Sequence, residues 1–268
     1  MMTRNFNTFQ GSRSFGFNSE FAEQFDGPIV YVGGNIASYA TTNNIYHPLT
    51  NLTGGIDTRP RVNDFVVIWS SAAMPTMGNY QAPSGYESGN GSATSTSGVD
   101  TAIRFSRKIF TYEEEFAEII GGTLGGGYGG IVGAQVFRRV KELGYGFPNT
   151  QTNSLDVATQ IFQTTNAGSI TVAMGGSITP VTSGAVILVG ASAGHTRGYR
   201  ENSGMDGSLN NVMTLGTNTT NDCSMSFGWR YWFQGDGPYT NGSFTFGTSA
   251  ADQSWAAMRA VLRPQYPS

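Results

Sequence analysis

The sequence predicts an all-β protein, a β-sandwich whose body is built from two similar sets of strands. Short apolar runs alternate with Gly, Asn, Ser and Pro turns along most of the chain, which is typical of antiparallel sheets. An internal repeat is the second observation, because the pattern of residues 63–73, NDFVVIWSSAA, returns at residues 183–193, SGAVILVGASA. Both observations favour one body of paired strands over several unlike domains.

Later segments of the two copies correspond as well. Each copy continues with a Ser-Gly turn and an alternating strand, and it closes on an apolar-apolar-Arg segment. These segments are Ser84-Gly85 and Ser203-Gly204, residues 103–107 and 225–229, and residues 134–138 and 259–263. The spacing between the copies drifts by a few residues, which indicates loop insertions between paired strands.

Composition limits the classes of partner. A chain of 268 residues can form a single all-β body. Charged residues make up 12% of the chain, against about 25% in an average globular domain. Its net charge of −3 offers no broad attraction to nucleic acid, and it contains no apolar run that predicts membrane insertion. The amino terminus also lacks the apolar core of a secretory signal.

Residues 1–27 differ from the body, which we assign to residues 28–268. The segment scatters phenylalanines among polar residues at neither helical nor strand period, so it cannot bury its aromatic rings on itself. It is predicted to be an extended anchoring arm, and a plain frayed terminus is the alternative. The candidate anchoring residues are Phe6, Phe9, Phe15, Phe17, Phe21 and Phe25.

Individual strands are predicted where β-branched or aromatic runs stop at turn residues. The first is Ile29–Val32, which Gly33-Gly34-Asn35 should end, and the next is the buried run Asp64–Trp69. Residues 72–99, rich in Ser, Gly, Thr, Asn and Pro, predict a long surface loop. Further strands are expected near residues 101–110, 131–140, 169–174, 184–189, 225–233, 243–246 and 255–262.

A stretch at about residues 111–130 looks like an insertion in the first half. Residues 111–120 are rich in helix formers and predict a short helix, with a hairpin arm as the alternative. The glycine run of residues 121–130 lacks the strand, loop and helix context of a phosphate cradle. The acidic cluster within residues 111–120 does not alternate with Gly or Asn as the ligands of calcium loops do, so a solvated face is favoured. The cluster is Glu113, Glu114, Glu115 and Glu118.

Motifs for chemistry are weak. Residues 190–194, GASAG, match the nucleophile elbow of hydrolases, but the residues after them are not helical and His47 lies upstream. Two histidines and one cysteine, distant in sequence, predict no zinc site, and Cys223 is expected to be a small buried hydrophobe. The chain is therefore expected to be no enzyme and to hold no metal or cofactor.

Tyrosines in the expected loops are candidate sugar contacts, because exposed tyrosines on a neutral, polar surface suit uncharged ligands. The segment Trp229–Phe233 is instead expected to supply core residues on alternate faces of a strand. The candidate glycan contacts are Tyr80, Tyr86, Tyr199 and Tyr239.

The body resembles a family of bacteriophage virion proteins from tail or appendage gene neighbourhoods. The likeness extends over roughly residues 28–264 and is carried by short motifs at residues 62–71, 82–86, 134–138, 180–188 and 255–264. It implies a jelly-roll-like β-sandwich with a structural role on the virion. The Phe-rich arm and the Glu/Gly-rich insertion depart from the family pattern.

Together these observations predict a structural component of a bacteriophage virion, in a tail, fibre or other surface appendage. Its arm would bind other virion proteins, and its loops would serve assembly or host attachment. We expect a homo-oligomer, with a trimer favoured by analogy with phage appendages. A glycan-binding host-receptor module, a capsid decoration protein and a polysaccharide hydrolase are the alternatives.

Overall fold

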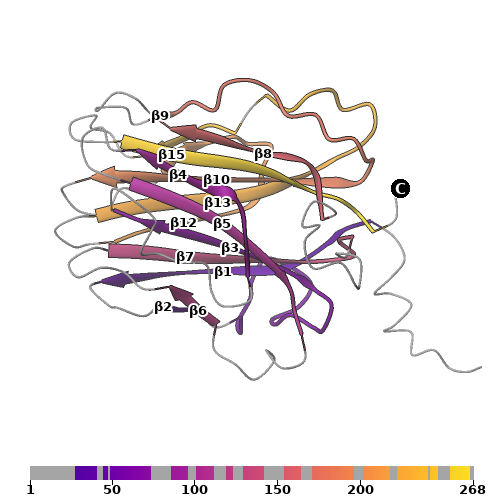
Figure 1. The fold of residues 1–268 in the computed structure, drawn as a ribbon, viewed down its shortest axis with the longest axis horizontal. Helices are drawn as coiled ribbons and strands as arrows, with labels where there is room; N and C mark the ends of the chain where they lie inside the picture. Colours follow the sequence, from indigo (N-terminus) through magenta and orange to yellow (C-terminus); the bar gives the residue numbers. More distant parts are fainter. Residues whose placement is uncertain are drawn as a thin grey trace, which may run out of the picture.

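A computed structural model describes most of the body. The described residues are 28–40, 45–47, 49–73, 86–95, 101–111, 119–122, 129–141, 154–163, 171–195, 202–217, 222–240, 242–246 and 254–265. Across these ranges the chain forms fifteen strands and no helix, and every strand pair is antiparallel (Figure 1). The predicted all-β class is confirmed.

The first half of the chain forms one five-stranded sheet, in the order β1-β7-β3-β5-β4. Its strands are β1 (Val30–Ala40), β7 (Gly129–Arg138), β3 (Phe65–Ala72), β5 (Thr101–Ile109) and β4 (Glu87–Ser95). The central strand β3 pairs with β5 and β7 over its whole length, so the apolar run recognised in the sequence is the middle of this sheet.

The second half forms the other five-stranded sheet, in the order β8-β15-β10-β13-β12. Its strands are β8 (Leu155–Gln163), β15 (Ser254–Leu262), β10 (Ala185–His195), β13 (Asp222–Trp232) and β12 (Asn210–Gly216). The central strand β10 carries the second copy of the repeat and pairs with β13 and β15.

The two sheets have the same connectivity. The order of the first sheet becomes that of the second when each strand is replaced by its equivalent: β1 by β8, β3 by β10, β4 by β12, β5 by β13 and β7 by β15. The small strands follow the same rule, since β2 (Ile45–His47) pairs with β6 (Ile119–Gly122) as β9 (Thr171–Val172) pairs with β14 (Phe244–Phe246). A further strand, β11 (Asn202–Met205), extends the second small sheet. The expectation of two similar strand sets is confirmed.

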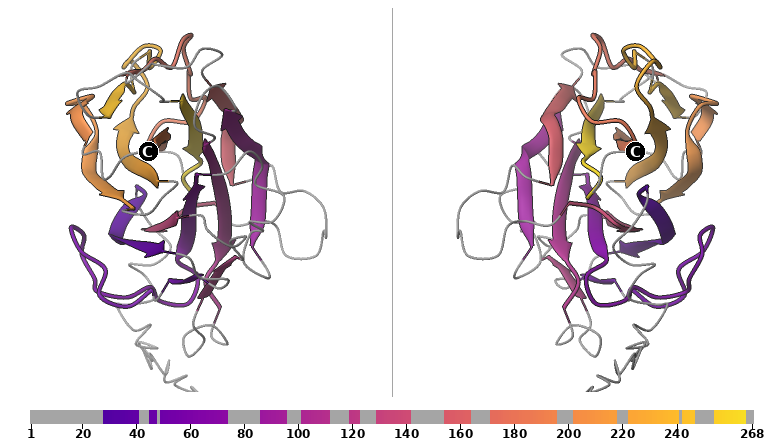
Figure 2. Two further views of the ribbon diagram at one scale, coloured as in Figure 1. Left: turned by 90° about the vertical axis from the view of Figure 1, so that its left-hand side faces the viewer. Right: turned by 90° about the vertical axis from the view of Figure 1, so that its right-hand side faces the viewer.

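The sheets pack face to face as a sandwich, and Figure 2 shows the two halves of the chain in separate layers. β1 packs on β12, and its equivalent β8 packs on β4; β7 packs on β13, and its equivalent β15 packs on β5. The two halves are therefore related by a pseudo-twofold axis between β3 and β10. The finer expectation of a jelly-roll-like strand path is not confirmed, because each sheet is drawn from one half of the chain.

Three apolar layers stabilise the sandwich. The middle layer lies between the sheets and includes Trp69, Phe105, Phe137 and Phe227. The other two cover the outer faces of the first and second sheets. Because β3, β7, β10 and β15 are buried along both faces, their sequences are mainly apolar or small and do not alternate between apolar and polar residues.

Two glycines make room for large rings between the sheets. A Cβ on Gly190 of β10 would lie 2.6 Å from the Trp69 ring, and one on Gly133 of β7 would lie 2.1 Å from the Phe227 ring. The rings of Trp69 and Phe227 stack with centroids 6.4 Å apart. Each sheet thus provides one bulky ring and one glycine, so the sheets interlock at their centre.

Several sequence expectations need correction. β1 continues past Gly33-Gly34-Asn35 with a bulge next to Tyr31, because hydrogen bonds to β7 carry it on. The expected loop of residues 72–99 contains the edge strand β4, whose polar residues pair with β5. Ile119 and Ile120 lie in β6, so the expected helix is wrong there, and residues 112–118 lie outside the described part. β6 pairs like β14, so this part of the insertion has a counterpart in the second half.

We predict that Gly133→Ala lowers the free energy of unfolding by about 1–3 kcal/mol, since its methyl group would overlap the Phe227 ring in a packed core. Gly175→Ala is the matched control, because a Cβ there has no neighbour within 4 Å. Urea unfolding of both variants tests this. Equal stabilities would contradict the described packing of the two sheets.

Candidate functional site

One end of the sandwich gathers the features that distinguish this surface. β1, β3, β8 and β10 begin there, while β7, β13 and β15 end there. The first described residue, Pro28, lies just before β1, and the last, Gln265, bonds to Arg139 after β7, so both lie at this end. It is the end of the sandwich where β1 begins, on the right of Figure 1. We call the end where β1, β3, β8 and β10 begin the proximal end.

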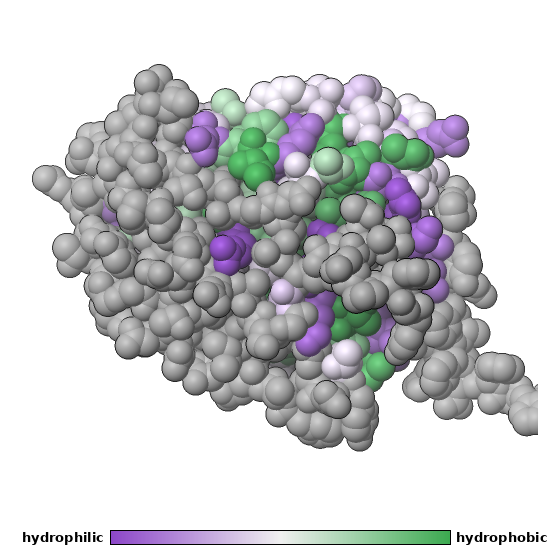
Figure 3. Space-filling view, in the orientation of Figure 1, coloured by the Kyte–Doolittle hydropathy of each residue, from purple (hydrophilic) through white to green (hydrophobic). Residues whose placement is uncertain are grey.

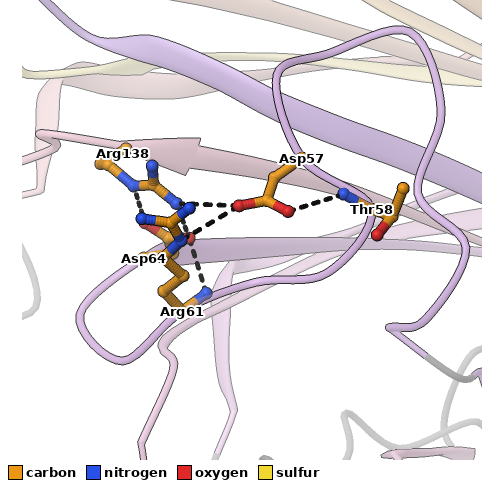
Figure 4. A network of polar contacts seen from close by, with 5 residues as sticks. All are labelled: Asp57, Thr58, Arg61, Asp64 and Arg138. Carbon is orange, nitrogen blue, oxygen red and sulfur yellow. Dashed lines mark hydrogen bonds and ion pairs between the residues drawn. The ribbon is translucent and has the colours of Figure 1, made fainter. Parts of the chain in front are cut away.

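A buried ion pair holds the loop before β3 against the end of β7 (Figure 4). Arg138 donates from Nε to Asp64 Oδ1 at 2.7 Å and from Nη2 to Asp64 Oδ2 at 3.0 Å. Asp64 Oδ2 also accepts the backbone amide of Arg61 at 2.8 Å. Burial raises the pKa of Asp64, while its hydrogen bonds with Arg138 and the Arg61 amide oppose that rise. The carboxylate thereby fixes where the central strand begins.

Asp57 extends this cluster toward solvent. Its Oδ2 lies 3.0 Å from Arg61 Nε and 3.9 Å from Arg138 Nη2, and its Oδ1 accepts the Thr58 amide at 2.9 Å. The Arg61 side chain is 52% exposed, so its pairing with Asp57 contributes little to stability. Arg61 is therefore a surface cation, whereas Arg138 is a structural one.

The second half repeats the arrangement with different residues. Arg263 follows β15 and donates from Nε to Asp156 Oδ1 at 3.1 Å. Asp156 Oδ2 accepts the backbone amides of Val181 and of Thr182, the latter at 2.9 Å. In the first half the arginine thus pairs with an aspartate of the loop before the central strand, and in the second half it pairs with an aspartate of β8 that binds that loop. The apolar-apolar-Arg signal in the sequence marks both positions.

Backbone hydrogen bonds join the two sheets at the proximal end. The amide of Lys141 donates to the carbonyl of Arg263, and the amide of Gln265 donates to the carbonyl of Arg139, each at 2.9 Å. Val140 and Pro264 form the β-bridge between them. The segments that leave β7 and β15 therefore hold this end together.

Exposed apolar and basic side chains share the proximal end. Four of the five exposed large hydrophobic residues found in the described ranges lie there; they are Ile56, Val62, Val181 and Phe233. The surrounding cations, exposed or half-buried, are Arg59, Arg61, Arg139, Lys141 and Arg263. Figure 3 shows apolar and hydrophilic groups side by side toward the right of the molecule. Such a mixed patch suits a protein partner.

Phe233 lies close to Ile29, one of the first described residues of the body. Its ring lies 5.9 Å from that of Tyr231, and the Tyr231 hydroxyl donates to the carbonyl of Ile29 at 2.6 Å. Trp229 and Tyr231 contribute to the middle core layer and Trp232 to the outer layer of the second sheet. The expectation of core residues on alternate faces holds for these three, whereas Phe233 is 44% exposed.

The candidate glycan tyrosines do not form an exposed platform. Tyr86 is buried against the outer face of the first sheet, where Lys108 lies over its ring. Tyr239 is buried on the second sheet and donates from its hydroxyl to Asp206 at 2.6 Å. Both predictions are corrected, because burial removes the ring faces that a sugar would stack on. Tyr80, Tyr199 and the six phenylalanines of the arm lie outside the described residues.

Arg259 is a buried cation that the sequence reading missed. It lies in β15, fully buried, and its Nη2 donates to the carbonyls of Met174 at 2.7 Å and Thr240 at 3.3 Å. Its guanidinium also lies 4.9 Å from the Phe162 ring centroid. Burial lowers the pKa of this guanidinium. Arg259 ties two loops over the second sheet, and an arginine inside an apolar strand was the signal for it.

Ser192, the serine of the elbow-like motif, is a buried strand residue. Its Oγ hydrogen bonds to the hydroxyls of Ser71 and Thr101, the latter at 2.8 Å. β10 continues to His195, whose Nε2 lies 3.1 Å from Ser224 Oγ. A nucleophile elbow displays its serine on a sharp turn before a helix, and Ser192 lies inside a paired strand. These hydroxyls connect the sheets across the pseudo-twofold axis.

The described ranges contain neither a metal-ligand cluster nor a membrane-spanning helix. Within them no three His, Cys, Asp or Glu side chains gather as metal ligands. The same ranges contain no helix that could cross a bilayer. Glu113, Glu114, Glu115 and Glu118 lie outside the described residues.

Comparisons with known proteins were made at the levels of family, sequence and structure. No family model, no curated protein and no solved structure matches this chain. The comparisons therefore add no support to the resemblance that the short motifs carry.

We predict that Cys223 does not react with thiol reagents in the native protein. Burial raises the pKa of its thiol to about 12, so the thiolate fraction at pH 8 is about one in ten thousand. Mass spectrometry after iodoacetamide treatment should show no label in buffer and a single label in denaturant. Rapid labelling of the folded protein would contradict the closed core around Cys223.

We also predict that Asp64→Ala lowers the free energy of unfolding by about 3–5 kcal/mol, because it leaves Arg138 charged and buried. Asp57→Asn is the control and should cost less than about 1 kcal/mol, since its partner Arg61 is largely exposed. The double variant Asp64→Leu/Arg138→Met should lose less unfolding free energy than the sum of the losses measured for Asp64→Leu alone and Arg138→Met alone. Additive losses would contradict the pairing.

Proposed function

We propose that this chain is a structural component of a bacteriophage virion, in a tail, fibre or other surface appendage. The proximal end would face the particle, and residues 1–27 would anchor the body there. The role is scaffolding and attachment, not catalysis. Resemblance of the body to phage virion proteins is the starting point for this proposal.

The observation that carries the proposal is the composition of the proximal end. Exposed apolar residues and cations gather at the proximal end, where residue 28 connects the body to the arm. Strands β3, β7, β10 and β15 are buried on both faces, so the centre of the sandwich is a packed scaffold. A packed body with a mixed apolar and basic patch at its proximal end is suited to attachment to a larger assembly.

The arm would supply much of the affinity. Burying one phenylalanine side chain contributes about 1.5–3 kcal/mol, so several of them outweigh the cost of ordering a short segment. The assembly is proposed to be a homo-oligomer, with a trimer preferred, because neighbouring copies could share an anchoring site on a symmetric particle. Loops at the opposite end would then point outward.

The same geometry suits a capsid decoration protein, because decoration also needs one attached end and one outward end. The glycan-binding alternative loses support, since Tyr86 and Tyr239 are buried. Separate binding assays with purified heads and purified tails of particles that lack this protein distinguish decoration from an appendage role.

We predict that Phe6→Ser/Phe9→Ser/Phe15→Ser weakens binding to such particles at least tenfold, because three apolar anchors are lost. Ile161→Ser is the control, since it removes an exposed apolar residue from the middle of edge strand β8. Co-sedimentation of labelled protein measures both. Undiminished binding of the triple variant, or no binding by the unchanged chain, would contradict the proposal.

A further inference from the structure

The arm has two halves of opposite character. Residues 1–16 contain Arg4 and Arg13 and no acidic residue. Residues 17–26, FNSEFAEQFD, contain three acidic residues, three phenylalanines and no basic residue. The half nearer the body is therefore acidic and aromatic, while the distal half is basic.

The proximal end is complementary to the nearer half. Its cations include Arg59, Arg61 and Lys141, all exposed, and half-buried Arg139. They outnumber the acidic residues not buried there, which are Asp57, paired with Arg61, and Asp236, beside Phe233. Its exposed apolar side chains include Ile56, 62% exposed, and Phe233, 44% exposed. Carboxylates and phenylalanine rings match this mixture of cations and apolar groups.

Chain connectivity brings the two together. Residue 26 is two residues before Pro28, and Tyr231 joins Ile29 to the side of Phe233. Ten extended residues span about 33–36 Å, and packed sheets are about 10 Å apart. Residues 17–26 are therefore long enough to cross the end of the sandwich from one sheet to the other. Docking within one chain also benefits from a high effective concentration.

We propose that residues 17–26 dock on the proximal end of the same chain. Acidic residues Glu20, Glu23 and Asp26 then lie among the exposed cations, and the phenylalanines cover the exposed apolar residues. This brace would fix the direction in which residues 1–16 leave the body. It concerns the isolated chain and so does not depend on the proposed virion role. With the patch covered in this way, Phe6, Phe9 and Phe15 of residues 1–16 would remain for attachment to a particle.

Hydrogen exchange of the full chain at low salt, followed by mass spectrometry, tests the brace. Amides of residues 17–26 should exchange at least tenfold more slowly than those of residues 1–16, and raised salt should reduce this protection. Arg59→Glu/Lys141→Glu should abolish it. Adding Glu20→Lys/Glu23→Lys to that variant should restore it, because the charges are exchanged.

Two controls separate docking from loss of the fold. Amides of β10 should keep their protection in every variant, which verifies the folded body. Phe233→Ser should weaken the protection of residues 17–26, while Ile161→Ser, away from the proximal end, should not.

Equal exchange in the two halves of the arm would overturn the brace. So would protection that survives the charge reversal or is not restored by the exchange of charges. Protection that rises with protein concentration would overturn docking within one chain, because it would indicate a neighbouring copy. Particle binding is not measured, so the outcome is independent of the test of the virion role.

Discussion

The contact between the two five-stranded sheets is the constraint on which the rest of the structure depends. Each central strand is buried on both faces, so neither sheet can leave its inner face in water. Burial of apolar surface contributes about 25 cal/mol per Å², and the middle layer draws its aromatic rings from both halves of the chain. The scarcity of charge in the sequence follows from this double burial.

Polar groups inside the sandwich are placed where they join elements. Arg138 and Arg263 hold the loops before the central strands, and the serine pair Ser71 and Ser192 joins the sheets. Buried ion pairs are rarely a net source of stability, but they specify a geometry because a misplaced partner would leave a charge buried alone. The two arginine pairs therefore fix the shape of the proximal end, which carries the exposed cations and apolar residues.

The sequence predicted the centre of the fold better than its edges. The runs at Asp64–Trp69 and residues 184–189 were recognised because strands buried on both faces are continuously apolar. Edge strands β4, β8 and β12 were missed, since they pair along one side and contain polar residues. The helix expected at residues 111–120 followed local propensity, whereas pairing with β2 makes Ile119 and Ile120 a strand.

Site residues were harder to predict than strands. Tyr86 and Tyr239 were expected in exposed loops, but both side chains pack into the apolar layers on the outer faces of the sheets. The apolar-apolar-Arg segments were noticed as a repeat, although their aspartate partners were not predicted. Asp64 lies in the loop before β3 and Asp156 in edge strand β8, and both reach their arginines only through tertiary packing. The proximal end combines residues from both halves of the chain, so no local pattern could have indicated it.

The orientation of the body on its particle is the most direct test of the account. An electron cryo-microscopy map of the virion that carries this chain would place the sandwich in density. We expect that the proximal end, with Arg138 and Arg263, faces the particle and that density continues from residue 28 into a neighbouring protein. A body with this end facing solvent and the opposite end attached would contradict it.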